Sequence, residues 1–170
     1  GVNAILSFSA MVPFGGWAAS GAKFAMKTID VANGGKTTLK WAVKTDDVVV
    51  FGNRNQLARV LGTKGTGKHA HHIIPWEMGD HLLVQKAAKS SKEFHMNEAL
   101  NGISLPSSSH LTGHSQYNAK IRSILDRMNL DVDSYDDAYN QLDSFIDYLS
   151  NLIQSNQGKS LGEIATLIDY

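Results

Sequence analysis

Toward the C-terminus, apolar side chains recur every three or four positions, a spacing that predicts helices. The first helix is expected to start close to His110, after Ser107–Ser109, whose hydroxyls can cap its N-terminus. A second helix is expected over residues 134–155. Ser160 with Glu163 three residues later has the pattern of a capping box, which predicts the start of a last helix. The apolar stripe of the first helix consists of Ile121, Ile124, Leu125 and Met128.

The N-terminal part of the chain, residues 1–67, is predicted to be mostly helical. An apolar run near the start would end at Pro13, and a longer one at Asn33-Gly34-Gly35, which is a helix-stop signal. The β-branched run at residues 48–51 indicates either a strand or the end of a helix. Helices are expected over residues 3–12, 16–32 and 36–44.

The middle of the chain alternates between short helices, a loop and two short strands. Asn53 can cap a helix, and the glycines and lysines of residues 62–67 indicate a loop. Residues 69–75 are expected to form a strand that ends at a proline, and residues 102–105 a second short strand. Residues 79–100 between them would form one or two helices.

These elements predict an α+β fold that is mostly helical, with a helical N-terminal region (1–67), a core (68–128) and C-terminal helices (129–170) packed on that core. The formal net charge is zero, but the charges are divided unevenly. Residues 1–128 carry 15 Lys and Arg against 8 Asp and Glu, whereas residues 129–170 carry one Lys against 8 acids. A basic face suits a polyanion such as nucleic acid. The alternative is that the charges merely solvate two surfaces.

All seven histidines lie between residues 69 and 114, and the chain has no cysteine to compete with them as a metal ligand. His71 and His72 are adjacent in the first predicted strand. Adjacent side chains of a strand point to opposite faces, so one imidazole can bind a metal ion while the other acts as a base. The alternative is a chance pairing in a histidine-rich loop.

His110 and His114 are four positions apart, so on one helix they would share a face and could bind one metal ion together. Taken alone, two histidines at this spacing are more often surface residues, or core residues with satisfied hydrogen bonds, than metal ligands. Asn101 could hold the imidazole of a general base in the useful orientation, since its amide oxygen can accept a hydrogen bond from the ring. Asn101-Gly102 is also a common turn sequence, which is the alternative.

Together, a His-His pair on a strand, an Asn-Gly pair opening a second strand and a capped helix with spaced histidines form a ββα unit. The unit resembles the HNH, or His-Me finger, nuclease superfamily. It is most similar to the AHH nucleases, which are typically toxin domains at the C-terminus of large bacterial polymorphic toxins. The resemblance covers about residues 68–128. It lies in Ala70–Pro75 (AHHIIP), Asn101–Pro106 (NGISLP) and the pair His110 and His114 followed by Tyr117.

The resemblance implies a ββα-metal centre with a role for each of its residues. His71 is implied as a metal ligand at the catalytic centre, His72 as the general base and Asn101 as the residue that orients His72. His110 is implied as a second metal ligand, and His114 as a third ligand or a phosphate contact. The implied cofactor is one divalent metal ion, and Mg²⁺, Mn²⁺, Ni²⁺ and Zn²⁺ remain open.

Substrate contacts are expected to go to the nucleic-acid backbone and to carry little sequence specificity. Solvent exposure is the alternative role for each candidate residue. His69 is expected to contact phosphate or solvent, and His81 and His95 are expected to lie at the surface. The candidates for nucleic-acid binding are Lys64, Lys68, Tyr117, Lys120, Arg122 and Arg127.

The function that follows from the resemblance is metal-dependent, low-specificity cleavage of DNA by an antibacterial toxin. The protein would be secreted from its producer and delivered into the cytoplasm of a target cell. Expected partners are DNA, a cognate immunity protein and a parent toxin with its secretion machinery; no stable membrane span is expected. An RNase or nicking toxin with the same centre is one alternative. A non-catalytic, metal-stabilised nucleic-acid-binding module is another, although a closed structural zinc site needs four ligands.

Overall fold

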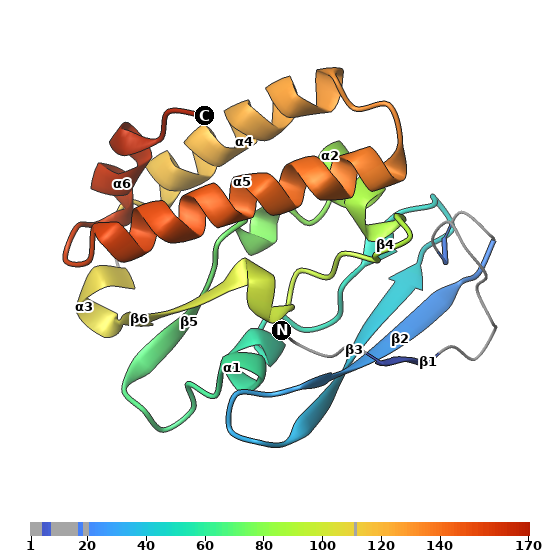
Figure 1. Ribbon diagram of the computed structural model, residues 1–170, viewed down its shortest axis with the longest axis horizontal. Coiled ribbons are helices and arrows are strands. Elements are labelled where there is room, and N and C mark those ends of the chain that lie inside the picture. Colours follow the sequence, from blue (N-terminus) through green and yellow to red (C-terminus); the bar gives the residue numbers. More distant parts are fainter. Residues whose placement is uncertain (1–4, 8–16, 19–20, 111) are drawn as a thin grey trace.

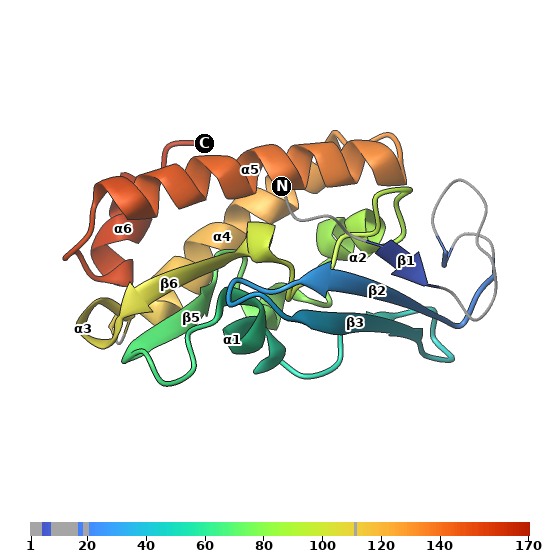
Figure 2. The same ribbon diagram turned by 60° about the horizontal axis from the view of Figure 1, so that its bottom comes forward.

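The computed structural model describes residues 5–7, 17–18, 21–110 and 112–170 (Figure 1). In this part of the chain, two small sheets lie on one side and the long helices on the other (Figure 2). The predicted α+β class is therefore confirmed. One hydrophobic core connects the sheets to the helices. Its largest fully buried side chains include Trp17, Trp41, Phe94, Tyr117 and Phe145.

The first sheet has four antiparallel strands in the order β1-β2-β3-β4. Its centre is the hairpin of β2 and β3, in which Ala25 pairs with Trp41 and Ile29 with Thr37. Alternate residues along both strands are buried, which is the pattern of a sheet with one face on the core. The strands are β1 (Ile5–Ser7), β2 (Phe24–Asp30), β3 (Lys36–Val43) and β4 (Val49–Val50).

The predicted helical character of the N-terminal region is wrong for most of its described residues. The ranges 16–32 and 36–44 contain strands β2 and β3 in place of helices. In the range 3–12, residues 5–7 form β1, and the others lie outside the described residues. Within the run at 48–51, Val49–Val50 form a strand, which confirms one of its two predicted alternatives.

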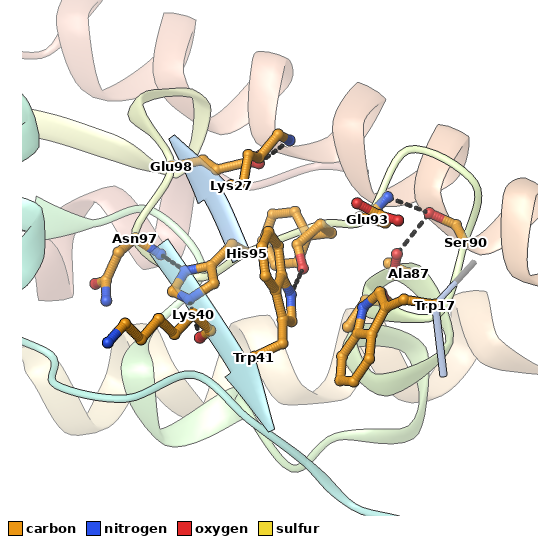
Figure 3. Close-up of polar contacts among 12 residues, drawn as sticks. Trp17, Lys27, Lys40, Trp41, Ala87, Ser90, Glu93, His95, Asn97 and Glu98 are labelled. Carbon is orange, nitrogen blue, oxygen red and sulfur yellow. Dashed lines mark hydrogen bonds and ion pairs between the residues drawn. The ribbon is translucent and has the colours of Figure 1, made fainter. Parts of the chain in front are cut away.

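Two features of the β2–β3 hairpin conceal its strand pattern in the sequence. Lys27 occupies a core-facing position of β2, where its ammonium group forms an ion pair with the buried carboxylate of Glu98 (Figure 3). A buried lysine interrupts the alternation of apolar and polar residues by which a strand is recognised. The segment Asn33-Gly34-Gly35 is the hairpin turn and not a helix stop, with Gly34 in the left-handed region at φ +91°.

The second sheet pairs β5 (Lys68–His72) with β6 (Gly102–Pro106), antiparallel, where the sequence predicts two strands. Its register sets His71 opposite Ile103 and His72 opposite Gly102. Helix α1 (Gln56–Leu61) packs on this sheet so closely that a Cβ on Gly102 would lie 2.7 Å from a methyl group of Leu57. The glycine at position 102 therefore lets α1 pack closely on β6, at the residue that pairs with His72.

The segment 79–100 holds one α-helix, α2 (Leu82–Ala88), followed by turns. The imidazole of His81 caps α2, because its Nδ1 accepts a hydrogen bond from the backbone of Leu83 at 3.1 Å. Both His81 and His95 are buried, which corrects the prediction that they lie at the surface. Two short 3-10 helices complete the region, η1 (Trp76–Met78) and η2 (Ala99–Asn101).

The helix predicted to start near His110 is divided in two. A short helix, α3 (Ser107–His110), ends before Gly113, and the long helix α4 (His114–Leu130) begins after it. Gly113 lies at φ +83°, and a Cβ there would be 2.1 Å from the backbone nitrogen of Gly162. His110 and His114 thus belong to different helices, and the argument that they share one helical face is wrong.

The remaining helices follow the prediction closely. Helix α5 (Tyr135–Ser155) starts after Ser134, whose hydroxyl accepts a hydrogen bond from the backbone of Asp137 at 3.0 Å. Helix α6 (Leu161–Leu167) has the predicted capping box of Ser160 and Glu163. Among the described residues, the helices are either too short or too polar to cross a lipid bilayer.

Candidate active site

His71 and His72 occupy the last two positions of β5, and both side chains are buried, at 5% and 7% exposure. The ring of His71 faces α4, with its centroid 5.8 Å from that of Tyr117. The ring of His72 faces the other way, 5.3 Å from Trp76. The adjacent histidines thus point to different neighbours, as the strand argument predicts, while both line one small cleft together with His114.

Two of the three predicted metal ligands lie side by side. The ring centroids of His71 and His114 are 6.2 Å apart, although one residue ends a strand and the other starts α4. The side chain of the third, His110, lies outside what the structure describes. Among the described side chains, no three His, Asp or Glu gather at one point. Imidazoles are ligands that divalent transition metals accept, so the donor set of this pair fits a divalent ion.

The ring of His72 is held by Asn97, a residue that the sequence does not single out. Its Nε2 lies 2.9 Å from the Asn97 Oδ1, and the Asn97 amide nitrogen donates to the backbone oxygen of Asn53 at 3.0 Å. Burial lowers the pKa of His72; the hydrogen bond to Asn97 raises it, and the charge of Arg54 lowers it again. His72 is therefore neutral near pH 7, with a ring nitrogen able to accept a proton.

Asn101, the predicted partner of His72, makes other contacts. Its side-chain oxygen accepts a hydrogen bond from the backbone of Ile74 at 2.7 Å, and its amide nitrogen donates to the backbone oxygens of Ile74 and Met96. Asn101 therefore fixes the chain that leaves His72, while Asn97 holds the ring. No local signal marks Asn97, because its role depends on a contact between segments distant in the sequence.

Tyr117, predicted to contact nucleic acid, is fully buried, which corrects that prediction. Its hydroxyl donates to the backbone oxygen of Ile73 at 2.7 Å, and burial raises its pKa. Tyr117 thus ties α4 to the chain just after His72. On the same helix, Asn118 lines the cleft, and Arg122 follows it by one turn on that face, exposed to solvent.

The remaining basic candidates of the C-terminal half lie elsewhere. Lys120 is exposed on α4, two positions from Asn118 and therefore on another side of the helix. Arg127, near the end of α4, donates a hydrogen bond to the backbone oxygen of Tyr170. Of the basic candidates on α4, Arg122 is therefore the one on the helical face that lines the cleft.

A wide depression of about 850 Å³ adjoins the cleft, and Arg54, Ala70 and His72 line both. Lys64 and Lys68, which the sequence predicts as substrate contacts, line it as well. The described residues of its wall include four cationic side chains and no Asp or Glu. The depression therefore presents positive charge beside His72. The cationic residues are Arg54, Arg59, Lys64 and Lys68.

A family model described as a nuclease family of the HNH/ENDO VII superfamily with conserved AHH matches residues 53–155. In this chain the AHH tripeptide is Ala70-His71-His72, and the match covers the cleft, both strands of the second sheet and α4. Comparison with curated proteins and with solved structures gives no match. The match spans more than half of the chain, which therefore belongs to the AHH nucleases of the HNH/ENDO VII superfamily.

Proposed function

We propose that the protein is a metal-dependent endonuclease that cleaves DNA with little sequence specificity. The observation that carries the proposal is the position of His72, a buried neutral imidazole between the His71–His114 pair and the basic depression. A base, a pair of metal-ligand side chains and a site for polyanions are the parts that metal-dependent hydrolysis of a phosphodiester uses. Family membership supports the nuclease activity.

His71 and His114 are the side chains that would hold the metal ion, and we assign His110 to it as a further ligand. Bound there, a divalent ion would supply positive charge that stabilises the negative charge developing on a phosphate oxygen and on the leaving oxygen. The chain offers imidazoles and no thiolate, so a wide range of divalent ions can bind.

His72 is the proposed general base. Its Nε2 faces Asn97, so its Nδ1 is the atom that takes a proton from a water molecule. The water oxygen bonds to phosphorus, the bond from phosphorus to the 3′ oxygen breaks, and the 3′ oxygen takes a proton from solvent. The products are a 5′-phosphate and a 3′-hydroxyl. A positioned base of this kind contributes about 10²- to 10⁴-fold to the rate.

Arg54, Lys64 and Lys68 are proposed to bind the phosphates beside the scissile bond, because they line the depression that His72 also lines. Arg122, exposed one helical turn after the cleft-lining Asn118, is proposed as a further phosphate contact along α4. Contacts of cations with phosphates read no base sequence, so they support low specificity and strong salt dependence.

We further propose that the nuclease acts as an antibacterial toxin, delivered by secretion machinery into the cytoplasm of a target cell. A nuclease without sequence specificity would also degrade the genome of its producer. A cognate immunity protein is therefore the expected partner. Induced expression in bacterial cytoplasm should arrest growth and fragment the chromosome, whereas the His72→Ala variant should do neither.

The direct test is digestion of supercoiled plasmid by the purified chain with a panel of divalent ions and with chelator. Cleavage is expected with metal ions and not with chelator. Parallel digestion of total RNA separates a DNase from an RNase, and the ratio of relaxed to linear plasmid identifies a nicking enzyme. Binding of DNA without cleavage under any of these conditions would contradict the proposal and favour a binding module.

A further inference from the structure

A chain of hydrogen bonds leads from the first sheet to the ring of His72. The Nε2 of His95 lies 2.9 Å from the backbone oxygen of Lys40 on β3, and the His95 Nδ1 lies 3.0 Å from the backbone nitrogen of Asn97 (Figure 3). The side chain of Asn97 then reaches His72 at 2.9 Å. The path therefore begins outside the matched residues 53–155.

The donors along this path follow from its fixed ends. The backbone oxygen of Lys40 can only accept, so the His95 Nε2 carries a proton. The backbone nitrogen of Asn97 can only donate, so the His95 Nδ1 is unprotonated. His95 is thus a neutral imidazole, in agreement with its burial, which lowers its pKa to about 3. Its ring is enclosed edge-to-face by Trp41 and Phe51, with centroids 4.6 and 5.3 Å away.

The orientation of the Asn97 amide is fixed in the same way. Its nitrogen donates to the backbone oxygen of Asn53 at 3.0 Å, so its oxygen is the atom that faces His72. An amide oxygen can only accept, and the His72 Nε2 must therefore carry the ring proton. The lone pair of His72 is left on Nδ1.

We infer that Asn97 is a positioning residue that keeps the proton of His72 on Nε2, and that His95 anchors Asn97 to the first sheet. The first sheet is thus a structural part of the catalytic centre and not an accessory to it. The role of the Nδ1 lone pair as a base rests on the proposed function, whereas the position of the ring proton does not.

The test is nitrogen-15 NMR of the histidine side chains in the chelator-treated chain of residues 1–170, with His72→Gln used to assign the signals. In the wild type, His72 should show an Nε2-bound proton that exchanges slowly with water. Asn97→Leu, which removes the acceptor at similar size, should lose this signal. Asn97→Asp, which restores an acceptor oxygen, should recover it.

Gln85→Leu is the matched control. Gln85 is also a buried amide that bonds to backbone, at Val49 and Gly79, but it does not contact His72. The control should lose stability and keep the His72 signal. If cleavage is found, Asn97→Leu should lower kcat about 10- to 100-fold with little change in KM, and Asn97→Asp should restore part of it.

A wild-type His72 that carries its proton on Nδ1 would overturn the inference, and this measurement needs only the assignment variant His72→Gln, and not Asn97→Leu, to fold. So would a slowly exchanging Nε2 proton that persists in Asn97→Leu. Absence of cleavage with every substrate would refute the proposed function but leave the NMR result to decide the role of Asn97.

Discussion

The imidazole ring centroids of His71 and His114 lie 6.2 Å apart, although the two residues come from the end of β5 and the first turn of α4. Tyr117 holds the two rings near each other, because its hydroxyl on α4 donates a hydrogen bond to the backbone oxygen of Ile73, just after β5. A strand and a helix thus present two imidazoles to one cleft.

If this pair binds the metal, removal of either ring should weaken metal binding. We expect His71→Ala and His114→Ala each to raise the Kd for Ni²⁺ or Zn²⁺ by more than about tenfold, measured by isothermal titration calorimetry. His69→Ala, which removes an exposed histidine of the same strand, is the control and should leave the Kd nearly unchanged. Equal affinity in all three variants would place the metal elsewhere.

The basic depression should determine the salt dependence of DNA binding. In a His72→Ala background, which prevents cleavage, the double variant Lys64→Ala/Lys68→Ala should reduce the slope of log K against log salt by about 2, or about one for each lost phosphate contact. Fluorescence anisotropy with a labelled duplex measures this slope.

Lys23→Ala/Lys44→Ala provides the matched control for charge, because both lysines are exposed, one just before β2 and one just after β3, and do not line the depression. Its salt slope should equal that of the His72→Ala parent. A reduction of the same size in the control would mean that DNA binding depends on the overall charge of the protein and not on the lysines of the depression.

Tyr117→Phe separates a structural role from a substrate contact. Loss of the hydroxyl leaves the buried oxygen of Ile73 without this donor, so the free energy of unfolding should fall by about 1–3 kcal/mol. Denaturant unfolding measures the loss. The affinity for DNA should not change, since the ring is fully buried; a large loss of affinity in a stably folded variant would contradict this assignment.

The buried neutral His95 makes stability depend on pH. Its pKa is about 3 in the folded protein and 6.5 in the unfolded chain, so below pH 6.5 the unfolded chain binds a proton that the folded protein does not. The free energy of unfolding contributed by His95 is complete above pH 6.5 and falls as the pH drops toward 3, by up to about 1.4 kcal/mol per pH unit.

Urea unfolding between pH 4.5 and 7.5 tests this dependence as the difference between the wild type and His95→Gln. The difference should shrink as the pH falls, because glutamine does not titrate. Other buried acids, such as Glu93, are present in both proteins and cancel. A difference that is constant across the range would show that His95 is not buried as a neutral ring.

The sequence predicts the second sheet and the C-terminal helices well, because their signals are local. The β-branched pair Ile73-Ile74 before Pro75 predicts extended chain, although strand β5 itself covers Lys68–His72 and not the predicted 69–75. The capping box of Ser160 and Glu163 needs only neighbours within one turn. The pair His71 and His72 could be given different roles from strand geometry alone.

The elements that the sequence missed depend on contacts between distant segments. The strand β2 places Lys27 in the core because Glu98 neutralises it there, and Asn97 reaches His72 only when the first sheet anchors its loop. Gly113 is the exception, since a glycine between His110 and His114 is a visible helix-stop signal that could have divided the predicted helix.

The most direct test of the account is the rate of plasmid cleavage by the wild type and by His72→Ala, each with a divalent metal and with chelator. Metal-dependent cleavage should fall by about 10²- to 10⁴-fold in His72→Ala, while Lys23→Ala/Lys44→Ala, outside the cleft and the depression, should stay close to the wild type. Cleavage that survives chelation, or that is as fast in His72→Ala as in the wild type, would contradict it.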